Sequence, residues 1–250
     1  MRAAIVDKAS ALEEHKNTIS LIERLLKKYS SSYEIIAKED LNKALDDFDL
    51  VIAAGGDGTL LYTASFVDSA LVLAVNSAPQ HSVGNLTSAN ASDLEEKLGR
   101  FYKGYFSVLN RTRLNVEIDS KHVGLALNEI YMGSIKPFGI AARYAIKVDD
   151  KEEEQKSSGI IVSTGTGSTA MFKHFGKAFK ANADYAKYAA VFPIGNYKLI
   201  GGKVREITVI SGMTKNDLLT IDGWQDFNYG HKTIIRVSIA DKPLRTIEFG

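Results

Sequence analysis

Residues 50–61 read LVIAAGGDGTLL, and this stretch decides the fold of the first part of the chain. Residues 50–54 form a short apolar run of the kind that becomes a strand buried on both faces. Three glycines then surround one carboxylate, Asp57, and a helix is predicted to follow as far as Phe66. A strand, a glycine loop and a helix in this order predict a ligand site at the carboxyl end of a parallel strand.

The glycine loop is suited to phosphates, but its carboxylate is not. Gly55, Gly56 and Gly58 let the backbone approach a ligand, and the exposed N–H groups of the next helix favour an anion. The loop is neither a Walker A loop nor a GxGxxG fingerprint. Asp57 would repel phosphate unless Mg²⁺ lay between them, or unless the carboxylate accepted the proton of an attacking hydroxyl. Both arrangements imply phosphoryl transfer; the alternative is a plain glycine turn in which Asp57 caps the next helix.

The first hundred residues alternate apolar runs with helical patterns. Strands are predicted at 3–6, 33–37, 50–54 and 71–75, and helices after Ser10, at 41–48, from the glycine loop to 66, and from Ser92 to about 102. Ser10 with Glu13, and Ser92 with Glu95, have the spacing of capping boxes. This alternation predicts a parallel sheet with helices on its faces.

After residue 100 the apolar period falls to two. Residues 114–118, 143–148 and 235–239 alternate apolar and polar side chains, which predicts half-buried antiparallel strands. A helical stretch after Gly167 and a mixed segment at about 176–192 are exceptions. We therefore expect an α/β plus β fold: a Rossmann-like domain with a parallel sheet at 1–103, which carries the glycine loop, and a β-rich, β-sandwich-like domain at 104–250.

Composition narrows the class of protein. The chain has 250 residues, 45% of them hydrophobic, which is enough for a sizeable core. Its 31 basic and 30 acidic residues create no field that would attract nucleic acid or an anionic membrane. There is no cysteine, so disulfides and thiolate metal sites are excluded. Because no signal or transit segment is recognisable, we expect a soluble, cytoplasmic protein with small-molecule ligands.

Three motifs together resemble the NAD kinase family. GGDGTLL at 55–61 resembles the signature that NAD kinases share with phosphofructokinases and with diacylglycerol and sphingosine kinases. ALNEIYMG at 126–133 and KSSGIIVSTGTGSTAM at 156–171 resemble the Asn-Glu segment and the third motif of NAD kinases. The resemblance covers nearly the whole chain. It implies transfer of the γ-phosphoryl group of ATP to the 2′-hydroxyl of the adenosine ribose of NAD, with Mg²⁺ carried largely by ATP and no dedicated protein metal site.

Two departures from common bacterial NAD kinases point to a branch of the family. The segment VNSAPQHSVGNLTS at 75–88 is longer than its bacterial counterpart, and Ser158 replaces an acidic residue. Both features resemble the mitochondrial type of NAD kinase, so we expect a compact relative of that branch and a homo-oligomer, with a dimer favoured. Because the chain ends at Gly250, we expect no terminal segment to return to the first domain.

The resemblance assigns roles to residues in both domains. Asp57 is the expected base that accepts the proton of the ribose hydroxyl. The residues expected to bind NAD or ATP are Gly55, Gly56, Gly58, Thr59, Asn76, Asn128, Glu129, Thr164, Thr166, Gly167, Ser168, Thr169 and Ala170. On their own, Asn128 and Glu129 would more simply be a polar pair at a strand end. The third motif could equally be a Ser/Thr turn that caps a helix.

Other residues carry weaker signals, and two rival functions stay open. His81 and His174 lie near the motifs, Asp222 before Gly223 suits a turn better than a ligand contact, and the aromatic residues at 224–229 suit a core or an interface. A lipid or sugar kinase would share the glycine signature. A non-catalytic dinucleotide sensor on the same scaffold would fit the departures at Ser158 and at 76–86. The phosphoryl donor, and NAD against NADH as acceptor, stay open.

Overall fold

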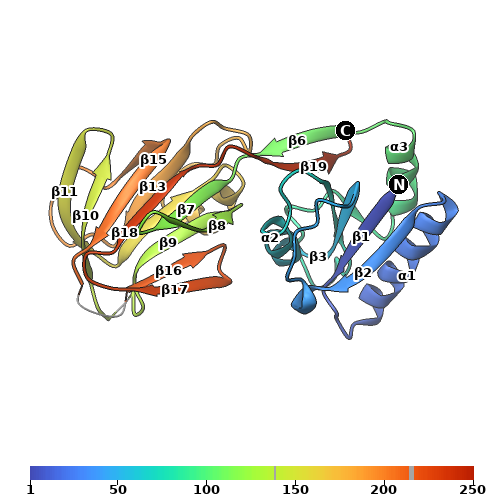
Figure 1. Ribbon diagram of the computed structural model, residues 1–250, viewed down its shortest axis with the longest axis horizontal. Helices are drawn as coiled ribbons and strands as arrows, with labels where there is room; N and C mark the ends of the chain where they lie inside the picture. The colour runs from blue at the N-terminus through green and yellow to red at the C-terminus, as the bar shows by residue number, and fades with distance from the viewer. Residues whose placement is uncertain (138, 214–216) are drawn as a thin grey trace. The chain divides into compact units, whose positions relative to one another are not determined.

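The chain forms two compact units (Figure 1). The computed structural model describes residues 1–137, 139–213 and 217–250. The first unit is Met1–Asn110 with Lys242–Gly250, and the second is Arg111–Asp241. This division differs from the one expected at 103/104 in two places: the first boundary falls after residue 110, and the last nine residues belong to the first unit. The segments at 104–110 and 242–250 contribute strands to the sheet of the first unit instead of to the second domain.

The first unit is the expected α/β fold. Its sheet has the order β2-β1-β3-β4-β19-β6, with β5 beside β4, and β1 to β5 pair in parallel. The strands are β1 (Arg2–Asp7), β2 (Ser32–Ala37), β3 (Leu50–Gly55), β4 (Leu71–Asn76), β5 (Ala89–Asn90), β6 (Ser107–Arg111) and β19 (Leu244–Glu248). The helices are α1 (Glu13–Lys28), α2 (Asp57–Ala64) and α3 (Leu94–Tyr102). The predicted parallel sheet is confirmed.

The capping boxes and one helix were predicted wrongly. Helix α1 follows Leu12 and α3 follows Asp93, and neither of these N-cap residues makes a side-chain cap. Residues 41–48 form no α-helix; only a 3₁₀ turn, η1 (Lys38–Asp40), precedes them. The reason is a tertiary contact, because the Asp46 carboxylate accepts N–H bonds from residues 68, 69 and 70. Leu41, Leu45 and Phe48 of this segment are buried without a helix.

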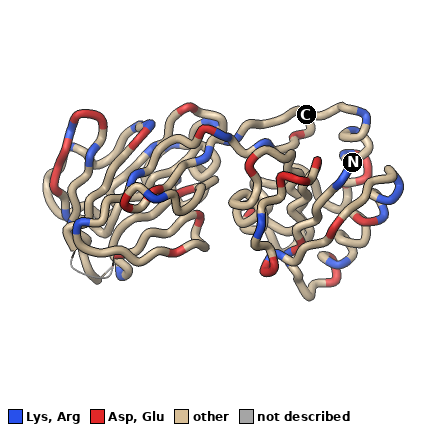
Figure 2. The backbone as a smooth tube through the Cα atoms, in the orientation of Figure 1, with Lys and Arg blue, Asp and Glu red and all other residues tan. Residues whose placement is uncertain are grey.

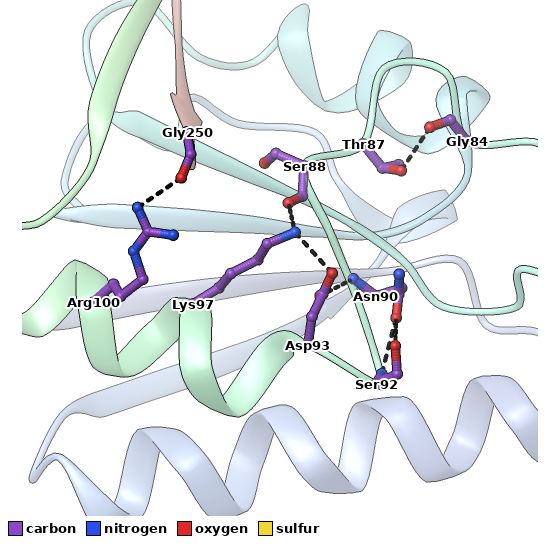
Figure 3. A network of polar contacts seen from close by, with 9 residues as sticks. All are labelled: Gly84, Thr87, Ser88, Asn90, Ser92, Asp93, Lys97, Arg100 and Gly250. Atoms are coloured by element: carbon purple, nitrogen blue, oxygen red, sulfur yellow. Dashed lines mark hydrogen bonds and ion pairs between the residues drawn. The ribbon is translucent and has the colours of Figure 1, made fainter.

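The chain end returns to the first unit, contrary to expectation. Strand β19 pairs in parallel with β4, and Ile247 is fully buried in the core of this unit. Arg100 of α3 donates a hydrogen bond to the Gly250 carbonyl at 3.0 Å (Figure 3). In the same network Lys97 Nζ lies 2.7 Å from both the Ser88 carbonyl and Asp93 Oδ2. The apolar face of β19 thus completes a core that residues 1–110 leave open.

The second unit is a β-sandwich of two antiparallel sheets, as predicted. One has the order β11-β10-β15-β18-β7-β8 and the other β14-β13-β12-β9-β16-β17. Their strands are β7 (Leu114–Ile118), β8 (Lys121–Ala126), β9 (Glu129–Ser134), β10 (Ala142–Val148), β11 (Lys151–Ser157), β12 (Gly159–Ser163), β13 (Ala186–Val191), β14 (Gly201–Val204), β15 (Glu206–Ser211), β16 (Asp217–Ile221), β17 (Gln225–Tyr229) and β18 (Ile234–Ile239). Inward apolar residues of both sheets, such as Val116, Ile146, Met132 and Val162, form one core.

The remaining features of the chain are short or polar. After Gly167 the predicted helical stretch is reduced to two 3₁₀ turns, η2 (Gly167–Thr169) and η3 (Met171–His174). The acidic run that begins at Asp149 starts in the exposed turn between β10 and β11. Figure 2 shows basic and acidic positions intermixed along the chain. Within the described ranges, no helix has both the length and the apolar character needed to cross a membrane.

We predict that Ile247→Ala lowers the free energy of unfolding of the first unit by about 2–4 kcal/mol, because it opens a cavity in the core. The measurement is urea-induced unfolding followed by circular dichroism. Ile35→Ala on β2 is the matched control, since Ile35 is 44% exposed and should lose much less stability. Equal losses for the two variants would mean that β19 does not complete this core.

Candidate functional site

The glycine loop lies at the carboxyl ends of two parallel strands. Gly55 of β3 and Asn76 of β4 are paired neighbours, and α2 begins directly after Gly56. A Cβ atom on Gly55 would overlap the Thr59 side chain, and one on Gly56 would overlap Ser82. A Cβ on Gly58 would meet nothing within 4 Å. Packing against Thr59 therefore requires glycine at 55, and Gly56 packs closely against Ser82, while Gly58 leaves its side of the loop open.

Asp57 is held by the loop that follows β4. Its Oδ1 accepts the Leu86 N–H at 2.8 Å, and its Oδ2 accepts the Asn85 N–H at 3.1 Å. The side chain is half-buried and makes no capping bond to α2, whose N-cap is Gly56. The alternative in which Asp57 simply caps its own helix is therefore not what the structure shows. Both carboxylate oxygens are oriented by backbone N–H groups from residues 85 and 86.

Asn76 shapes this loop. It is 5% exposed, its Nδ2 donates to the Ser82 carbonyl at 3.0 Å, and its Oδ1 accepts the Ala78 N–H at 3.3 Å. Gly84 has a φ of +65°, and a Cβ there would overlap the Asn76 amide. Both polar atoms of the Asn76 amide thus form hydrogen bonds with the backbone of the loop. The expected contact of Asn76 with the dinucleotide stays a prediction. His81 lies exposed on the same loop.

One polar network at this edge was missed by the sequence analysis. His15 of α1 is 2% exposed; its Nε2 lies 2.6 Å from Asp7 Oδ1 and its Nδ1 lies 2.7 Å from Ser77 Oγ. The Ser77 N–H in turn donates to the Gly55 carbonyl at 3.1 Å. The network connects the ends of β1, β3 and β4. The available signal was the position of Asp7 and Ser77 directly at the ends of predicted parallel strands.

In the second unit, the Asn-Glu segment and the third motif contact each other directly. The Thr164 N–H donates to the Asn128 carbonyl at 2.9 Å, and Thr164 Oγ1 donates to the Leu127 carbonyl at 2.5 Å. A Cβ on Gly167 would overlap the Asn128 carbonyl and would lie 2.6 Å from Glu129 Oε2. Glycine at 167 is therefore required for the two motifs to lie this close.

Most hydroxyl groups of the third motif are used inside the motif. Ser168 Oγ donates to the Gly165 carbonyl at 2.6 Å and accepts the Phe179 N–H at 3.1 Å. Thr169 Oγ1 lies 3.4 Å from the Thr166 carbonyl, and the Ala170 N–H donates to Gly167 at 2.8 Å. The motif is thus a tight turn that leads into 3₁₀ structure, and it caps no α-helix. The Thr166 hydroxyl differs from the others, because it is buried with no hydrogen-bond partner within residues 1–137, 139–213 and 217–250.

Asp222 has a larger role than the turn predicted for it. It follows β16 with a φ of +50° and is 9% exposed. Its carboxylate accepts N–H bonds from Leu127 at 2.7 Å, Asn128 at 2.7 Å and Glu129 at 3.0 Å. Burial raises the pKa of Asp222 to about 6, and the three N–H bonds oppose that rise. The carboxylate thus sets the backbone course of the Asn-Glu segment.

Glu129 is the most perturbed carboxyl group near the motifs. Burial raises its pKa to about 7, the negative charge of Asp222 adds to the rise, and the Met171 N–H opposes it. Three atoms here are buried without a hydrogen-bond partner among the described residues: Asn128 Oδ1, Glu129 Oε2 and Thr166 Oγ1. Because buried polar atoms are nearly always paired, this group indicates a place where a ligand supplies the partners.

The remaining candidates are not brought to this group. Ser158 precedes β12, at the opposite end of that strand from Thr164, and its hydroxyl donates to the Pro137 carbonyl. At a strand rise of about 3.3 Å per residue, the two ends of β12 are roughly 15 Å apart. The replacement at Ser158 therefore leaves the third-motif turn itself intact. His174 ends η3 and is exposed.

Sequence comparisons find NAD and NADH kinases. No protein-family model matches the chain. A probable NADH kinase from Oryza sativa subsp. japonica is 30% identical over 179 residues, covering 62% of this chain and 55% of the rice protein. The chain thus spans about half the length of that relative. The NAD kinase of Methanosarcina mazei is 25% identical over 252 residues, covering 94% of this chain and 86% of the archaeal protein.

Solved structures agree with these relatives. The crystal structure of an NAD kinase from Archaeoglobus fulgidus in complex with ATP has a TM-score of 0.78 and 25% identity, and the match covers 100% of this chain and 94% of that one. Yeast NADH kinase complexed with NADH has a TM-score of 0.82 and 17% identity, with 100% and 84% covered. The yeast protein shows the shared fold alone.

The fold class is thus a unit with a parallel sheet and a glycine loop, together with a β-sandwich unit that carries a buried polar group. Within that class, the curated relatives and the Archaeoglobus structure support the NAD kinase family. The mitochondrial-type branch is a finer assignment, and the comparisons do not confirm it.

We predict that Glu129→Gln changes the pH dependence of stability. A carboxyl whose pKa is raised on folding contributes stability below its unfolded pKa of 4.5 and loses it as pH rises through about 7. Glutamine cannot ionise, so the variant should gain stability relative to the wild type as pH rises from about 4.5 to 8, by at most ~3 kcal/mol. Urea unfolding at several pH values measures the difference, and a difference independent of pH would contradict the raised pKa.

Proposed function

We propose that this chain is an NAD kinase, a phosphotransferase that converts NAD and ATP to NADP and ADP. The observation that carries the proposal is the group of buried, partnerless polar atoms on Asn128, Glu129 and Thr166. These atoms lie on two segments that contact each other and that match the Asn-Glu and third motifs. The curated NAD kinases and the Archaeoglobus structure with ATP support the same activity.

Asp57 is the general base of the reaction. The 2′-hydroxyl of the adenosine ribose is a poor nucleophile at neutral pH. Its oxygen bonds to the γ-phosphorus of ATP, the bond from that phosphorus to the bridging oxygen breaks, and Asp57 accepts the hydroxyl proton. Such proton removal contributes roughly 10²–10⁴ in rate. The N–H groups of Asn85 and Leu86 support this role, because they fix the carboxylate without consuming all of its acceptor capacity.

The second unit holds the dinucleotide. Asn128 Oδ1 and Thr166 Oγ1 offer a buried acceptor and a hydroxyl to ribose and base groups, and Glu129 lies beside them. Gly55, Gly56, Gly58 and Thr59 in the first unit surround the triphosphate, with Gly58 on the open side of the loop. The hydroxyls of Thr164, Ser168 and Thr169 support the turn that presents Thr166.

Mg²⁺ enters as part of the MgATP substrate. Among residues 1–137, 139–213 and 217–250, no three His, Cys, Asp or Glu side chains form a cluster that would hold a metal ion. A metal carried by the nucleotide neutralises charge on the phosphates without a protein cage. ATP is the proposed donor. NAD is the proposed acceptor; NADH is the alternative acceptor, because plant relatives are named NADH kinases.

The rival functions fit the geometry less well. A non-catalytic sensor would have no use for Asp57 fixed by two N–H bonds beside the open side of Gly58. Ser158, whose replacement of an acidic residue suggested a sensor, lies at the opposite end of β12 from the third-motif turn. A lipid or sugar kinase would need the glycine loop but leaves the buried polar group on Asn128, Glu129 and Thr166 without a ligand. Membership of the mitochondrial-type branch, and a cytoplasmic location, stay predictions.

The chain also forms a homodimer, in this proposal, through the second unit. The segment between β13 and β14 exposes three large apolar side chains: Phe192 is 57% exposed, Ile194 54% and Ile200 49%. Strand β14, which follows directly, is the edge strand of its sheet. Apolar side chains beside a strand edge are typical of an interface, and a second copy of the same chain presents the same surface.

We predict that Asp57→Asn retains NAD binding and lowers kcat by at least about a hundredfold. Asparagine keeps the size of the side chain, and its one amide oxygen can still accept one of the two N–H bonds, but it cannot take up the proton. NADP formation from NAD and MgATP is read by a coupled dehydrogenase, and NAD binding by calorimetry. Wild-type protein that binds NAD without forming NADP would favour the sensor. If the Asp57→Asn variant has the kcat of the wild type, the assignment of Asp57 as the base is wrong, but the kinase activity still stands.

We predict that the wild-type chain is a dimer in solution and that Ile200→Asp shifts it towards monomer, because a buried carboxylate would oppose association. Size-exclusion chromatography with light scattering over a tenfold range of concentration measures the mass. Val83→Asp is the control: Val83 is 85% exposed in the first unit, and its replacement should leave the mass unchanged. A wild-type monomer throughout that range would rule out this interface.

A further inference from the structure

The surroundings of Glu129 are unusual for an ionised carboxylate. Its Oε2 is buried with no hydrogen-bond partner among the described residues, and a Cβ atom on Gly167 would lie 2.6 Å from it. Among the described residues, the donor that acts on the carboxyl group is the Met171 N–H. An ionised oxygen buried without a donor is strongly disfavoured, whereas a protonated one needs only an acceptor, which a ligand can bring.

The charges that face Glu129 favour the neutral form. Asp222, in the turn after β16, accepts the Glu129 N–H and brings a negative charge near this carboxyl group. From the described segment 167–171, the Met171 N–H acts on it as a donor. On β12 its partner is Ser163, which carries no charge. In the described residues no Lys, Arg or His acts on this carboxyl, so no cation compensates a second negative charge.

The two carboxyl groups have different donors. Asp222 accepts three backbone N–H groups, whereas Glu129 accepts one. Because hydrogen bonds donated to a carboxylate stabilise its ionised form, the negative charge of the pair belongs on Asp222 and the proton on Glu129. The arrangement therefore fixes which of the two groups can donate.

We propose that Glu129 acts as a protonated hydrogen-bond donor to an uncharged acceptor atom of the dinucleotide, and that Asp222 is the positioning residue that keeps it protonated. The acceptor is a ribose oxygen or a ring nitrogen of a nucleobase. This inference rests on the proposed function and deepens it. It reverses the simpler assignment, in which an ionised Glu129 accepts hydrogen bonds from ribose hydroxyls.

Proton-dependent NAD binding follows from this assignment. Above the pKa of Glu129 each pH unit removes about nine-tenths of the competent form, so the Kd for NAD should rise about tenfold per unit. Asp222 acts only through Glu129 and the backbone of residues 127–129. Changing it should move the pH at which binding weakens, which a merely structural contact would not do.

The test is calorimetric titration of the full chain with NAD alone, without ATP, between pH 6.5 and 8.5. Wild-type affinity should fall about tenfold per pH unit above pH 7. Glu129→Gln, which always carries a donor, should bind NAD within about threefold of the wild-type affinity at pH 6.5 and keep that affinity at pH 8.5. Asp222→Asn should weaken from a lower pH than the wild type, because the negative charge near Glu129 is lost.

The matched control is Asp226→Asn, which makes the same change at an exposed position on β17, where the carboxylate accepts the Thr220 hydroxyl. Its pH profile should equal that of the wild type. If Asp222→Asn does not fold, as judged by circular dichroism, the comparison of wild type with Glu129→Gln decides. A wild-type profile without pH dependence, or a Glu129→Gln variant that has lost NAD at pH 6.5, overturns this inference but leaves the kinase intact. Absence of NAD binding at every pH contradicts the proposed function as well.

Discussion

The second unit depends on one buried carboxylate. Asp222 accepts hydrogen bonds from three consecutive backbone N–H groups, those of residues 127 and 128 in the bend between β8 and β9 and that of residue 129, the first of β9. A neighbouring strand could not accept all three of these hydrogen bonds, because successive N–H groups along a strand point to opposite sides. The positive φ of Asp222 turns its side chain back onto this segment. Removal of the carboxylate would leave three buried donors unpaired, at a cost of about 1–3 kcal/mol for each.

This constraint explains how side-chain oxygens of the Asn-Glu segment can stay available to a ligand. Side chains that satisfied these N–H groups from within the segment would have no atoms left for a ligand. With Asp222 in that role, Asn128 Oδ1 and Glu129 Oε2 have no hydrogen-bond partner in the part of the chain that the structure describes. In the first unit, too, other residues hold the candidate site residue in place. Residues 85 and 86 hold Asp57, while His15 connects the ends of β1 and β4.

The periodic parts of the fold could be predicted from sequence, and the long-range polar contacts could not. Apolar runs and alternation located the parallel sheet and the sandwich, since each pattern depends on neighbours along the chain. The segment 41–48 has a helical pattern, yet Asp46 satisfies N–H groups more than twenty residues away. Asp222 acts across 93 to 95 positions. Motif resemblance found Asn128 and Glu129, but no local signal pointed to Asp222 as their support.

The 76–86 loop of the first unit can vary in sequence and still hold Asp57. The 76–86 loop, for which the sequence analysis predicts a departure from the common bacterial pattern, supplies the Leu86 N–H that bonds to Asp57 Oδ1. Its course is set by the Asn76 amide and by the positive φ of Gly84, both within the loop. A loop of different length can therefore serve the same carboxylate, provided that two N–H groups reach it. The sequence of the 76–86 loop is thus compatible with the role proposed for Asp57, because the contacts that this carboxylate receives from the loop come from backbone rather than from side chains.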